Sequence, residues 1–417
     1  MSEVVNLYLG PMIGQGTSGI VYPVLSREDC NATSRKEIRT DEGVPDGSIQ
    51  TLNAAPPNTY VAKEVKLEES TRDSILKEVE LHRDCSKNSL GVVQYLLSGM
   101  TPGNDPSLFV VMEACQGELW DTLIAYGANS FQRKSSLRRS GINVKPGMNR
   151  SSSRMSISAP QNLGSAVDVG SSAPGLPKED ERLSWTRSLC DAVRHCHSLG
   201  VLHRDLNPWN VLIVASKTGD SSRSVRLADF GLAVRLSNPA TELSGLEVDG
   251  AAPLDDSALG SLYSAPELGV LYTFPADLFS LGMVLLAIWS TIDVALLDGG
   301  GSEDSMITCV EGAKNAAAEG VQCPDHVLKS IKEGRDAELR TLILRMLSSQ
   351  PRNRPSAVDA CGWVHKWLAE RSPRVVTQTV QCETQQTIEV QRPWFAKLCT
   401  CFKKQPPEAD WRLAETE

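Results

Sequence analysis

The sequence predicts an α+β fold in which a small, strand-rich part with one helix precedes a larger, mainly helical part. Two observations support this fold class. Most patterned segments before residue 115 have strand character, and helical spacing of apolar residues dominates beyond residue 183. We expect strands within residues 4–24, 60–67 and 108–112. We expect helices at residues 70–85, 183–199, 278–288 and 339–347.

Three polar segments interrupt or follow these elements. Residues 26–58 contain three prolines, and we expect them to form a long loop between two strands. Residues 128–178 contain twelve serines and eight Lys or Arg residues against one Asp, so they cannot bury enough apolar surface to fold alone. A third irregular block, residues 373–417, follows the last expected helix.

These boundaries divide the chain into two lobes with attachments. The expected divisions are residues 1–115 for the first lobe, including its polar insertion at 26–58, residues 116–127 for the start of the second lobe, 128–178 for a disordered basic insertion, 179–372 for the rest of the second lobe and 373–417 for a C-terminal tail.

Composition limits the class of protein. The chain has 417 residues and a net charge of −9, which disfavours a dedicated nucleic-acid binder. Eleven cysteines without a C-x-x-C pair fit reduced thiols, and no secretory signal opens the sequence. The longest apolar run, residues 278–289, is too short to span a bilayer. We therefore expect a cytoplasmic protein.

A glycine-rich segment from Ile13 to Val21 carries Gly14, Gly16 and Gly19 between two strands. Glycines at this spacing let the backbone approach phosphates closely. The motif alone is weak, because a dinucleotide-binding turn or a plain hairpin can show it too. A dinucleotide site needs a helix to begin within the motif, whereas strand character continues after Gly19.

Downstream residues add charged groups in a fixed order. Lys63 projects from an expected strand, and Glu78 on the following helix is placed to pair with it, with Glu80 as a competing partner. The strongest pattern is the string from His203 to Asn210, followed by Asp229-Phe230-Gly231 and then by Ala265-Pro266-Glu267. Together these motifs resemble the protein kinase family from about Leu7 to Leu368. Isolated helix caps and turns are the alternative for the separate acidic and amide residues.

The resemblance implies a two-lobed protein-kinase fold that binds ATP and Mg²⁺ between the lobes. It implies that Asp205 accepts or orients the proton of the substrate hydroxyl, and that Asn210 and Asp229 bind magnesium. Lys63 would contact the α- and β-phosphates, and Glu78 would position Lys63.

The nucleotide site implied by the resemblance draws on both lobes. Its expected residues are Ile13, Gly14, Gln15, Gly16, Thr17, Ser18, Gly19, Val21, Ala62, Lys63, Met112, Glu113, Cys115 and Leu212. Met112 would control access to the back of the pocket, and backbone groups of Glu113 and Cys115 would face adenine. A plain core strand is the alternative for this last segment.

Two further matches are scaffold positions. The run from Asp277 to Gly282 looks like the family's central buried helix. Arg354 matches the arginine that pairs with the glutamate of the Ala-Pro-Glu motif, which is Glu267 here.

We expect specificity for serine and threonine hydroxyls, because Pro208 and residues 260–264 resemble the corresponding segments of serine/threonine kinases. Dual specificity is the less favoured alternative. Asn207 stands where most serine/threonine kinases carry lysine, so a pseudokinase or ATP-binding scaffold is the rival function. We expect Asn207→Lys to raise turnover, because it restores a positive charge near the γ-phosphate. A small-molecule kinase is disfavoured, because the Ala-Pro-Glu segment suits a peptide substrate.

Regulation is expected at two places. Arg204 marks kinases whose activation segment is phosphorylated, and Ser257 has suitable spacing, although Asp255 and Asp256 could supply negative charge instead. Within residues 128–178, several serines lie next to arginines and look like phosphate acceptors for an upstream kinase. The alternative is that this segment is a solvated linker.

Residues 392–404 of the tail combine bulky apolar residues, four basic residues and two cysteines. This mixture suits a membrane surface, with palmitate on Cys399 or Cys401 as a second anchor. The alternatives are packing on the second lobe and binding of a calmodulin-like partner.

Overall fold

The computed structural model describes residues 3–16, 19–26, 32–40, 47–56, 59–123, 177–215, 223–236, 262–267, 273–297, 302–324, 327, 331 and 336–371, with only the backbone of 291–297 and 302–308. All of them belong to the first of two units, Met1–Ser372; the second is Pro373–Glu417. The predictions for Thr17, Ser18, Ser257, residues 128–176 and the tail concern residues outside these ranges.

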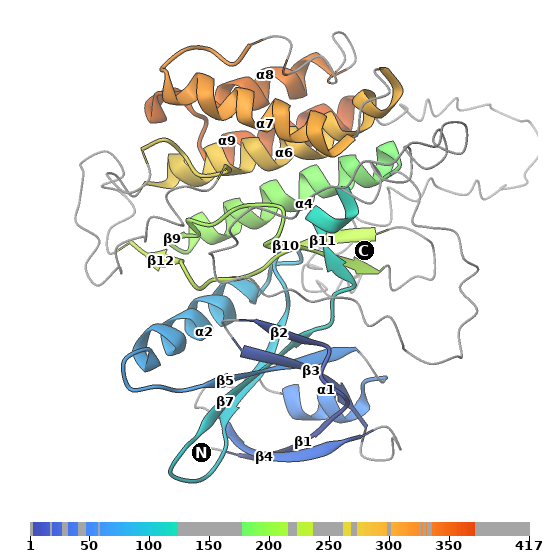
Figure 1. The fold of residues 1–417 in the computed structure, drawn as a ribbon, viewed down its shortest axis with the longest axis vertical. Coiled ribbons are helices and arrows are strands. Elements are labelled where there is room, and N and C mark those ends of the chain that lie inside the picture. The colour runs from blue at the N-terminus through green and yellow to red at the C-terminus, as the bar shows by residue number, and fades with distance from the viewer. Residues whose placement is uncertain are drawn as a thin grey trace, which may run out of the picture. The chain divides into compact units, whose positions relative to one another are not determined.

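The N-terminal strands form one antiparallel, seven-stranded sheet (Figure 1). Its strands are β1 (Val4–Leu9), β2 (Gly14–Gly16), β3 (Gly19–Leu25), β4 (Ser34–Thr40), β5 (Tyr60–Lys66), β6 (Tyr95–Met100) and β7 (Ser107–Glu113). The order is β1-β4-β6-β7-β5-β3-β2, and β1 also pairs with β3. This additional pairing closes the sheet into a barrel-like ring, from which β2 extends.

The loop prediction for residues 26–58 is wrong for two segments within them. Ser34–Thr40 forms β4, which pairs with β1 along its whole length and with β6 at Arg39 and Thr40. Ser48–Ala54 forms the short helix α1. The strand has only one aliphatic residue, Ile38, and its burial among the strands of the ring outweighs the polar composition of its neighbours.

Alternate residues of β7 face two different clusters, as the pleat of a strand requires. Phe109 and Val111 lie inside the ring, with Ile38 and Ala62 in the same cluster. Leu108 and Val110 lie on the other face and pack with Val79 of α2 (Arg72–Ser86). The predicted helix at residues 70–85 is therefore present, and its apolar side fixes it to the outside of the sheet.

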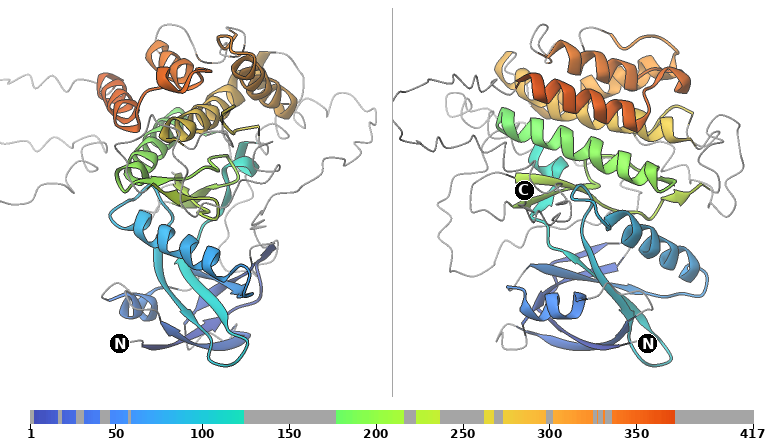
Figure 2. Two further views of the ribbon diagram at one scale, coloured as in Figure 1. Left: turned by 90° about the vertical axis from the view of Figure 1, so that its left-hand side faces the viewer. Right: turned by 180° about the vertical axis from the view of Figure 1, so that it is seen from behind.

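The C-terminal part is mainly helical (Figure 2). Its helices are α4 (Glu179–Ser198), α6 (Phe274–Leu297), α7 (Ser302–Ala318), α8 (Ala337–Met346) and α9 (Ala357–Arg371), with a 3-10 turn at Pro351–Asn353. Its short strands are β8 (Gly117–Glu118), β9 (Val201–Leu202), β10 (Val211–Ala215), β11 (Arg223–Leu227) and β12 (Val234–Arg235). The three predicted helices of this part are confirmed, although α6 extends well beyond the predicted 278–288, and α4 and α8 each begin earlier and end one residue sooner than predicted.

Helix α6 is the centre of this part. Its side chains from Leu278 to Trp289 are almost completely buried, because other elements pack around the whole circumference. A helix that is apolar on every side needs such a surrounding. Among the described helices, none combines the length and the apolar character that a bilayer crossing requires.

Candidate functional site

Lys63 and Glu78 form the predicted ion pair. Strand β5 presents Lys63 and helix α2 presents Glu78, and Lys63 Nζ lies 3.1 Å from Glu78 Oε1. Glu80, the competing partner, is exposed because it lies two residues further around the helix. The Lys63 side chain is buried, so acidic side chains of the protein must balance its charge.

The charge of Lys63 is held by two acidic residues. Burial lowers the pKa of its amine, but the negative charges of Glu78 and Asp229 outweigh burial and raise that pKa above its usual value. Lys63 is therefore cationic at neutral pH. The electrostatic effect of Asp229 also connects this lysine of the sheet with a carboxylate of the helical part.

The segment from Asp205 to Asn210 is a closely bonded turn. Asn207 Nδ2 donates to Asp205 Oδ1 and Asn210 Nδ2 donates to Asp205 Oδ2, each at 2.7 Å. Asn207 Oδ1 accepts the backbone N–H groups of Trp209 and Asn210 at 3.0 and 3.1 Å. Asn207 is thus a buried residue that orients the Asp205 carboxylate and caps the turn behind it.

Asp277, at the start of α6, anchors the backbone before this turn. Its carboxylate accepts the N–H groups of His203 and Arg204 at 2.8 and 2.9 Å and contacts His197 Nε2 at 2.9 Å. Burial raises the pKa of Asp277, but the hydrogen bond and charge of His197 outweigh burial and lower it below its usual value. The anchored Arg204 adopts φ 67°, which a non-glycine residue rarely does.

Asp229 is placed by its own backbone and by its neighbour Phe230. Asp229 has φ 61°, and Ala228 N donates to Asn210 O at 2.9 Å, which brings the two predicted metal ligands to adjacent segments. The Phe230 ring is buried between His82, stacked at 5.5 Å, and His203 at 5.0 Å. Packing of Phe230 on one side leaves Asp229 at the wall of the cavity.

A cavity of about 990 Å³ is lined by eight of the predicted site residues, and Asp205 is not among the residues of its wall. Its wall includes Gln15, Gly19, Lys63, Glu78, Met112, Asn210, Leu212 and Asp229. Gly19 has φ +136°, and a Cβ there would lie 2.4 Å from Glu64 O, so only glycine fits this approach of two backbones. The cavity is large enough for a nucleotide-sized ligand.

Several predicted nucleotide residues lie outside this wall. Ala62 is wrong: it neighbours Lys63 in a strand, so its side chain points the other way, into the barrel core. Val21 lies directly opposite Lys63 in the register and shares its face of the sheet. Ile13, Gly14 and Gly16 shape the glycine-rich segment through pairing with β3.

Of the three residues expected at adenine, Met112, Glu113 and Cys115, only Met112 lines the cavity, together with Val110 of the same strand. The Glu113 carboxylate is buried 3.4 Å from Arg226 Nε, and the Glu113 N–H donates to Gln94 O at 2.8 Å. Burial raises the pKa of the Cys115 thiol to about 12, so it stays protonated. Cys115 is therefore not a nucleophile at neutral pH.

The sequence motifs missed an aromatic group beside Asp205. The ring of Trp209 lies 4.4 Å from that of Trp120 and meets Tyr263 edge-on at 5.7 Å. Trp209 also lines the cavity. The only sequence signal for this aromatic group was the position of Trp209 within the string from His203 to Asn210. Trp120 comes from a distant segment, so nothing in the sequence indicated that the two rings meet.

Glu267 and Arg354 form the predicted scaffold pair. Arg354 Nη2 lies 2.9 Å from Glu267 Oε2, and the second guanidinium nitrogen contacts the other carboxylate oxygen. Lys314 donates to the backbone oxygen of Ser264, three residues before Glu267. The pair is bidentate and largely buried, which ties the Ala-Pro-Glu segment to the turn that precedes α9.

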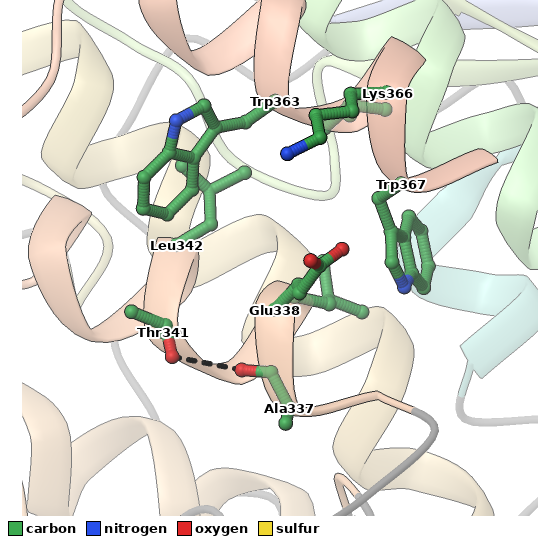
Figure 3. A pocket seen from close by; sticks show the side chains of 9 residues that line it. Ala337, Glu338, Thr341, Leu342, Trp363, Lys366 and Trp367 are labelled. Carbon is green, nitrogen blue, oxygen red and sulfur yellow. Dashed lines mark hydrogen bonds between the residues drawn. The ribbon is translucent and has the colours of Figure 1, made fainter. Parts of the chain in front are cut away.

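A second cavity, of about 300 Å³, lies between α8 and α9 and contains none of the predicted site residues. The rings of Trp363 and Trp367 stand on opposite sides of it, with Leu342 below (Figure 3). Its polar groups are few, so the larger cavity is where convergent charged groups favour chemistry.

The donor atoms at the large cavity fit a hard divalent cation. Hydrogen bonds to Asp205 occupy the Asn210 amide nitrogen, so the amide oxygen is the end available for a metal. Asp229 supplies carboxylate oxygens on the adjacent segment. Oxygen ligands of this kind suit Mg²⁺.

Comparison with known proteins finds a family match for the C-terminal part of the chain. Residues 161–368 match the family model described as a protein kinase domain, a range that includes Asp205, Asn210 and Asp229 but not Lys63 or Glu78.

Three curated relatives illustrate the similarity. The chain is 30% identical over 246 residues to the serine/threonine-protein kinase PEPKR2 of Arabidopsis thaliana, covering 58% of this chain and 44% of that protein. It is 32% identical over 182 residues to the membrane-associated tyrosine- and threonine-specific cdc2-inhibitory kinase wee-1.3 of Caenorhabditis elegans, covering 43% and 22%. It is 37% identical over 106 residues to the serine/threonine-protein kinase PknI of Mycobacterium tuberculosis, covering 24% and 18%. The chain therefore spans less than half the length of each of these relatives.

Proposed function

The chain belongs to the protein kinase family, and we propose that it is a serine/threonine kinase that transfers the γ-phosphate of ATP to hydroxyl groups of protein substrates. One observation carries the proposal: the buried Lys63–Glu78 pair, at 3.1 Å, lines the same cavity as Asn210 and Asp229. The lysine and glutamate lie outside the residues that match the family model, so their position is independent support.

Each group has a role in phosphoryl transfer, which depends on positioning and on neutralising charge. Lys63, kept cationic by Glu78, would bind the α- and β-phosphates. Asn210 and Asp229 would hold Mg²⁺, which neutralises the phosphate oxygens when bound. Asp205 would accept or orient the proton of the acceptor hydroxyl, in a direction fixed by Asn207 and Asn210.

The choice of serine and threonine rests on sequence and on relatives. Pro208 and residues 260–264 resemble serine/threonine kinases, and two of the three relatives above carry that description. The third is described as tyrosine- and threonine-specific, so phosphotyrosine is the outcome that would change the assignment.

The rival is a kinase-like scaffold that binds ATP without transfer. Its supporting observation is Asn207, which brings no positive charge to the γ-phosphate. The structure-based argument against it is that Asn207 still donates to Asp205 at 2.7 Å, so the orientation of the carboxylate does not depend on a lysine.

A radiolabelled-ATP assay on a peptide library tests the proposal. Wild type should label serine or threonine peptides, and Asp205→Asn, Lys63→Met and Asp229→Ala should each lower transfer at least about 100-fold with an unchanged melting temperature. Matched controls are Lys87→Met and Asp105→Ala, which remove exposed groups outside the cavity wall and should keep the rate. Wild-type transfer by any of the three site variants would refute the assignment of that residue.

Regulation and location are proposed from sequence alone. An upstream kinase would act on Ser257 or on residues 128–178, and a cytoplasmic protein would reach membranes through Cys399 and Cys401. Mapping the phosphorylated residues of the active protein tests the proposal for Ser257. Active protein without phosphate at Ser257 would refute it. Cys399→Ser/Cys401→Ser should move the protein from the membrane to the soluble fraction, and a wild type that is already wholly soluble contradicts the anchor.

A further inference from the structure

Three potential metal ligands meet between two helices outside the kinase site. Asp191 lies on α4, and Cys361 and His365 lie one turn apart on α9, with their ligand atoms within 4.8 Å of one another. Helices α4 and α9 contact each other along the C-terminal part (Figure 2). None of the three residues lines the large cavity or the smaller one.

The three side chains already have the spacing of a tetrahedral site. Cys361 Sγ lies 3.0 Å from Asp191 Oδ1 and 3.7 Å from His365 Nε2, and His365 Nε2 lies 3.2 Å from the Asp191 carboxylate. Around a zinc ion with bonds of about 2.0–2.3 Å, tetrahedral ligand atoms are separated by about 3.3–3.6 Å. Shifts of about half an ångström would therefore admit the ion.

The chemical types of the ligands select the metal. A thiolate, an imidazole and a carboxylate together suit Zn²⁺, whereas Mg²⁺ and Ca²⁺ take oxygen ligands only. The spacing of Cys361 and His365 by four residues puts both on one face of α9. His365 is 42% exposed, so the site opens to solvent and leaves room for a water as fourth ligand.

Two arginines face the same carboxylate. Arg187 Nε lies 3.6 Å and Arg194 Nε lies 3.8 Å from Asp191 oxygens, and both side chains are substantially exposed. Burial raises the pKa of the Cys361 thiol to about 11, and Asp191 raises it further, while Arg194 lowers it. The arginines repel a cation but favour the thiolate, and long, exposed pairs of this kind are weak enough to rearrange.

We propose that Asp191, Cys361 and His365 bind a zinc ion that joins α4 to α9. The Cys361 S–H bond breaks on binding, its sulfur coordinates the metal, and the proton leaves to solvent. In the structure the same atoms form a hydrogen-bonded cluster, in which Cys361 donates to Asp191. The site is independent of the proposed kinase chemistry, because it uses none of that cavity's residues.

Cobalt substitution tests the site directly. The full chain is used in a Cys399→Ser/Cys401→Ser background, which removes the closely spaced tail thiols as competing ligands. One equivalent of Co²⁺ should give a thiolate-to-metal charge-transfer band that Zn²⁺ displaces. Both Cys361→Ser and His365→Ala should abolish the band and lower zinc affinity at least about 100-fold, since loss of even an outer-shell partner costs about 10- to 100-fold.

A control and a second measurement keep the result interpretable. Cys309→Ser removes a half-buried thiol from α7, outside the cluster, and should keep both the band and the affinity. Zinc should raise the melting temperature of the background protein but not that of His365→Ala, whose exposed side chain can be removed without loss of the fold. A band that persists in Cys361→Ser, or zinc stabilisation that persists in His365→Ala, would overturn the proposal.

Discussion

At the scale of single residues, Asn207 shows how a motif position can change its task. In the sequence pattern, Asn207 stands where a lysine is usual. In the structure, the Asn207 amide makes two kinds of hydrogen bond. Its nitrogen orients Asp205, and its oxygen accepts the N–H groups of Trp209 and Asn210. A lysine could perform the first task but has no acceptor for the second.

This geometry reverses the expectation for Asn207→Lys. The substitution removes the side-chain acceptor of the Trp209 N–H, at a cost of about 1–3 kcal/mol, whereas the Asn210 N–H keeps the backbone oxygen of residue 207 as an acceptor at 3.1 Å. We therefore expect turnover to fall about tenfold and the melting temperature to drop, measured by steady-state kinetics and thermal unfolding. A Lys variant faster than wild type would show that charge outweighs the turn.

Gly19 gives a second test at this scale. Alanine there meets Glu64 O at 2.4 Å and adopts an unfavourable φ, which should distort β3 and β5 beside Lys63. We expect Gly19→Ala to weaken ATP binding about tenfold by calorimetric titration. Gly103 also has a positive φ, 124°, but open space around it, so Gly103→Ala separates backbone strain from the clash. Equal losses in both variants would refute the clash argument.

At the scale of elements, the Phe230 stack links helix α2 to the segment of Asp229. His82 lies one turn after Glu78 on α2, stacks on Phe230 and bonds Val93 O at 2.9 Å through Nε2. Burial lowers the pKa of His82, which outweighs the hydrogen bond to Val93 and the charge of Glu78, while Lys63 lowers it further. The fold therefore keeps this histidine neutral.

A neutral buried histidine makes the protein sensitive to mild acid. Below about pH 6.5 the unfolded chain takes up a proton that the folded His82 resists, so stability falls as pH falls. His195, whose pKa is also lowered by burial, acts in the same direction over the same pH range, whereas the stabilisation from Asp277, whose pKa is lowered too, is lost only below about pH 4. We expect His82→Leu to lose part of the drop in melting temperature between about pH 7.5 and pH 5.5. An identical drop in both proteins would show that His82 does not contribute.

Elements were predictable where one physical pattern dominated. Helix α6 and strand β7 have continuous apolar runs, and α2 has clear helical spacing, so their positions follow from sequence. Strand β4 does not, because its pairing with β1 decides its structure and its own residues are mostly polar. Ala62 was assigned to the wrong face, since a one-residue step in a strand reverses the side chain.

At the scale of the molecule, the candidate site was predictable because its residues sit in local strings, whereas contacts between distant segments were not. The strings from His203 to Asn210 and from Asp229 to Gly231 were readable in the sequence. The Trp120–Trp209 contact and the cluster of Asp191 with Cys361 and His365 each join segments far apart in the chain. The spacing of residues within one segment cannot predict contacts between segments that are far apart in the chain.

The predicted insertion at residues 128–178 interrupts the second lobe in sequence, after its expected start at residues 116–127, and the C-terminal boundary of the insertion can be refined. Lys178 lies at the N-terminal end of α4, and Glu181 Oε2 accepts its backbone N–H at 3.1 Å. Glu181 also pairs with Arg223 at 2.9 Å, so this helix start is tied to β11. The serine-rich composition predicts few contacts with the cavity for the residues before Lys178.

We therefore expect replacement of residues 128–176 by a Gly/Ser linker to leave both ATP affinity and the melting temperature close to wild type. A matched variant, Glu181→Ala, removes the acceptor of the Lys178 N–H and the partner of Arg223, and loss of a helix cap alone costs about 1 kcal/mol, or roughly 2–4 °C for a domain of this size. The difference between this variant and the linker replacement, measured by thermal unfolding, separates the start of α4 from the insertion. A collapsed melt or lost ATP binding in the linker replacement would show that residues 128–176 are part of the folded kinase domain.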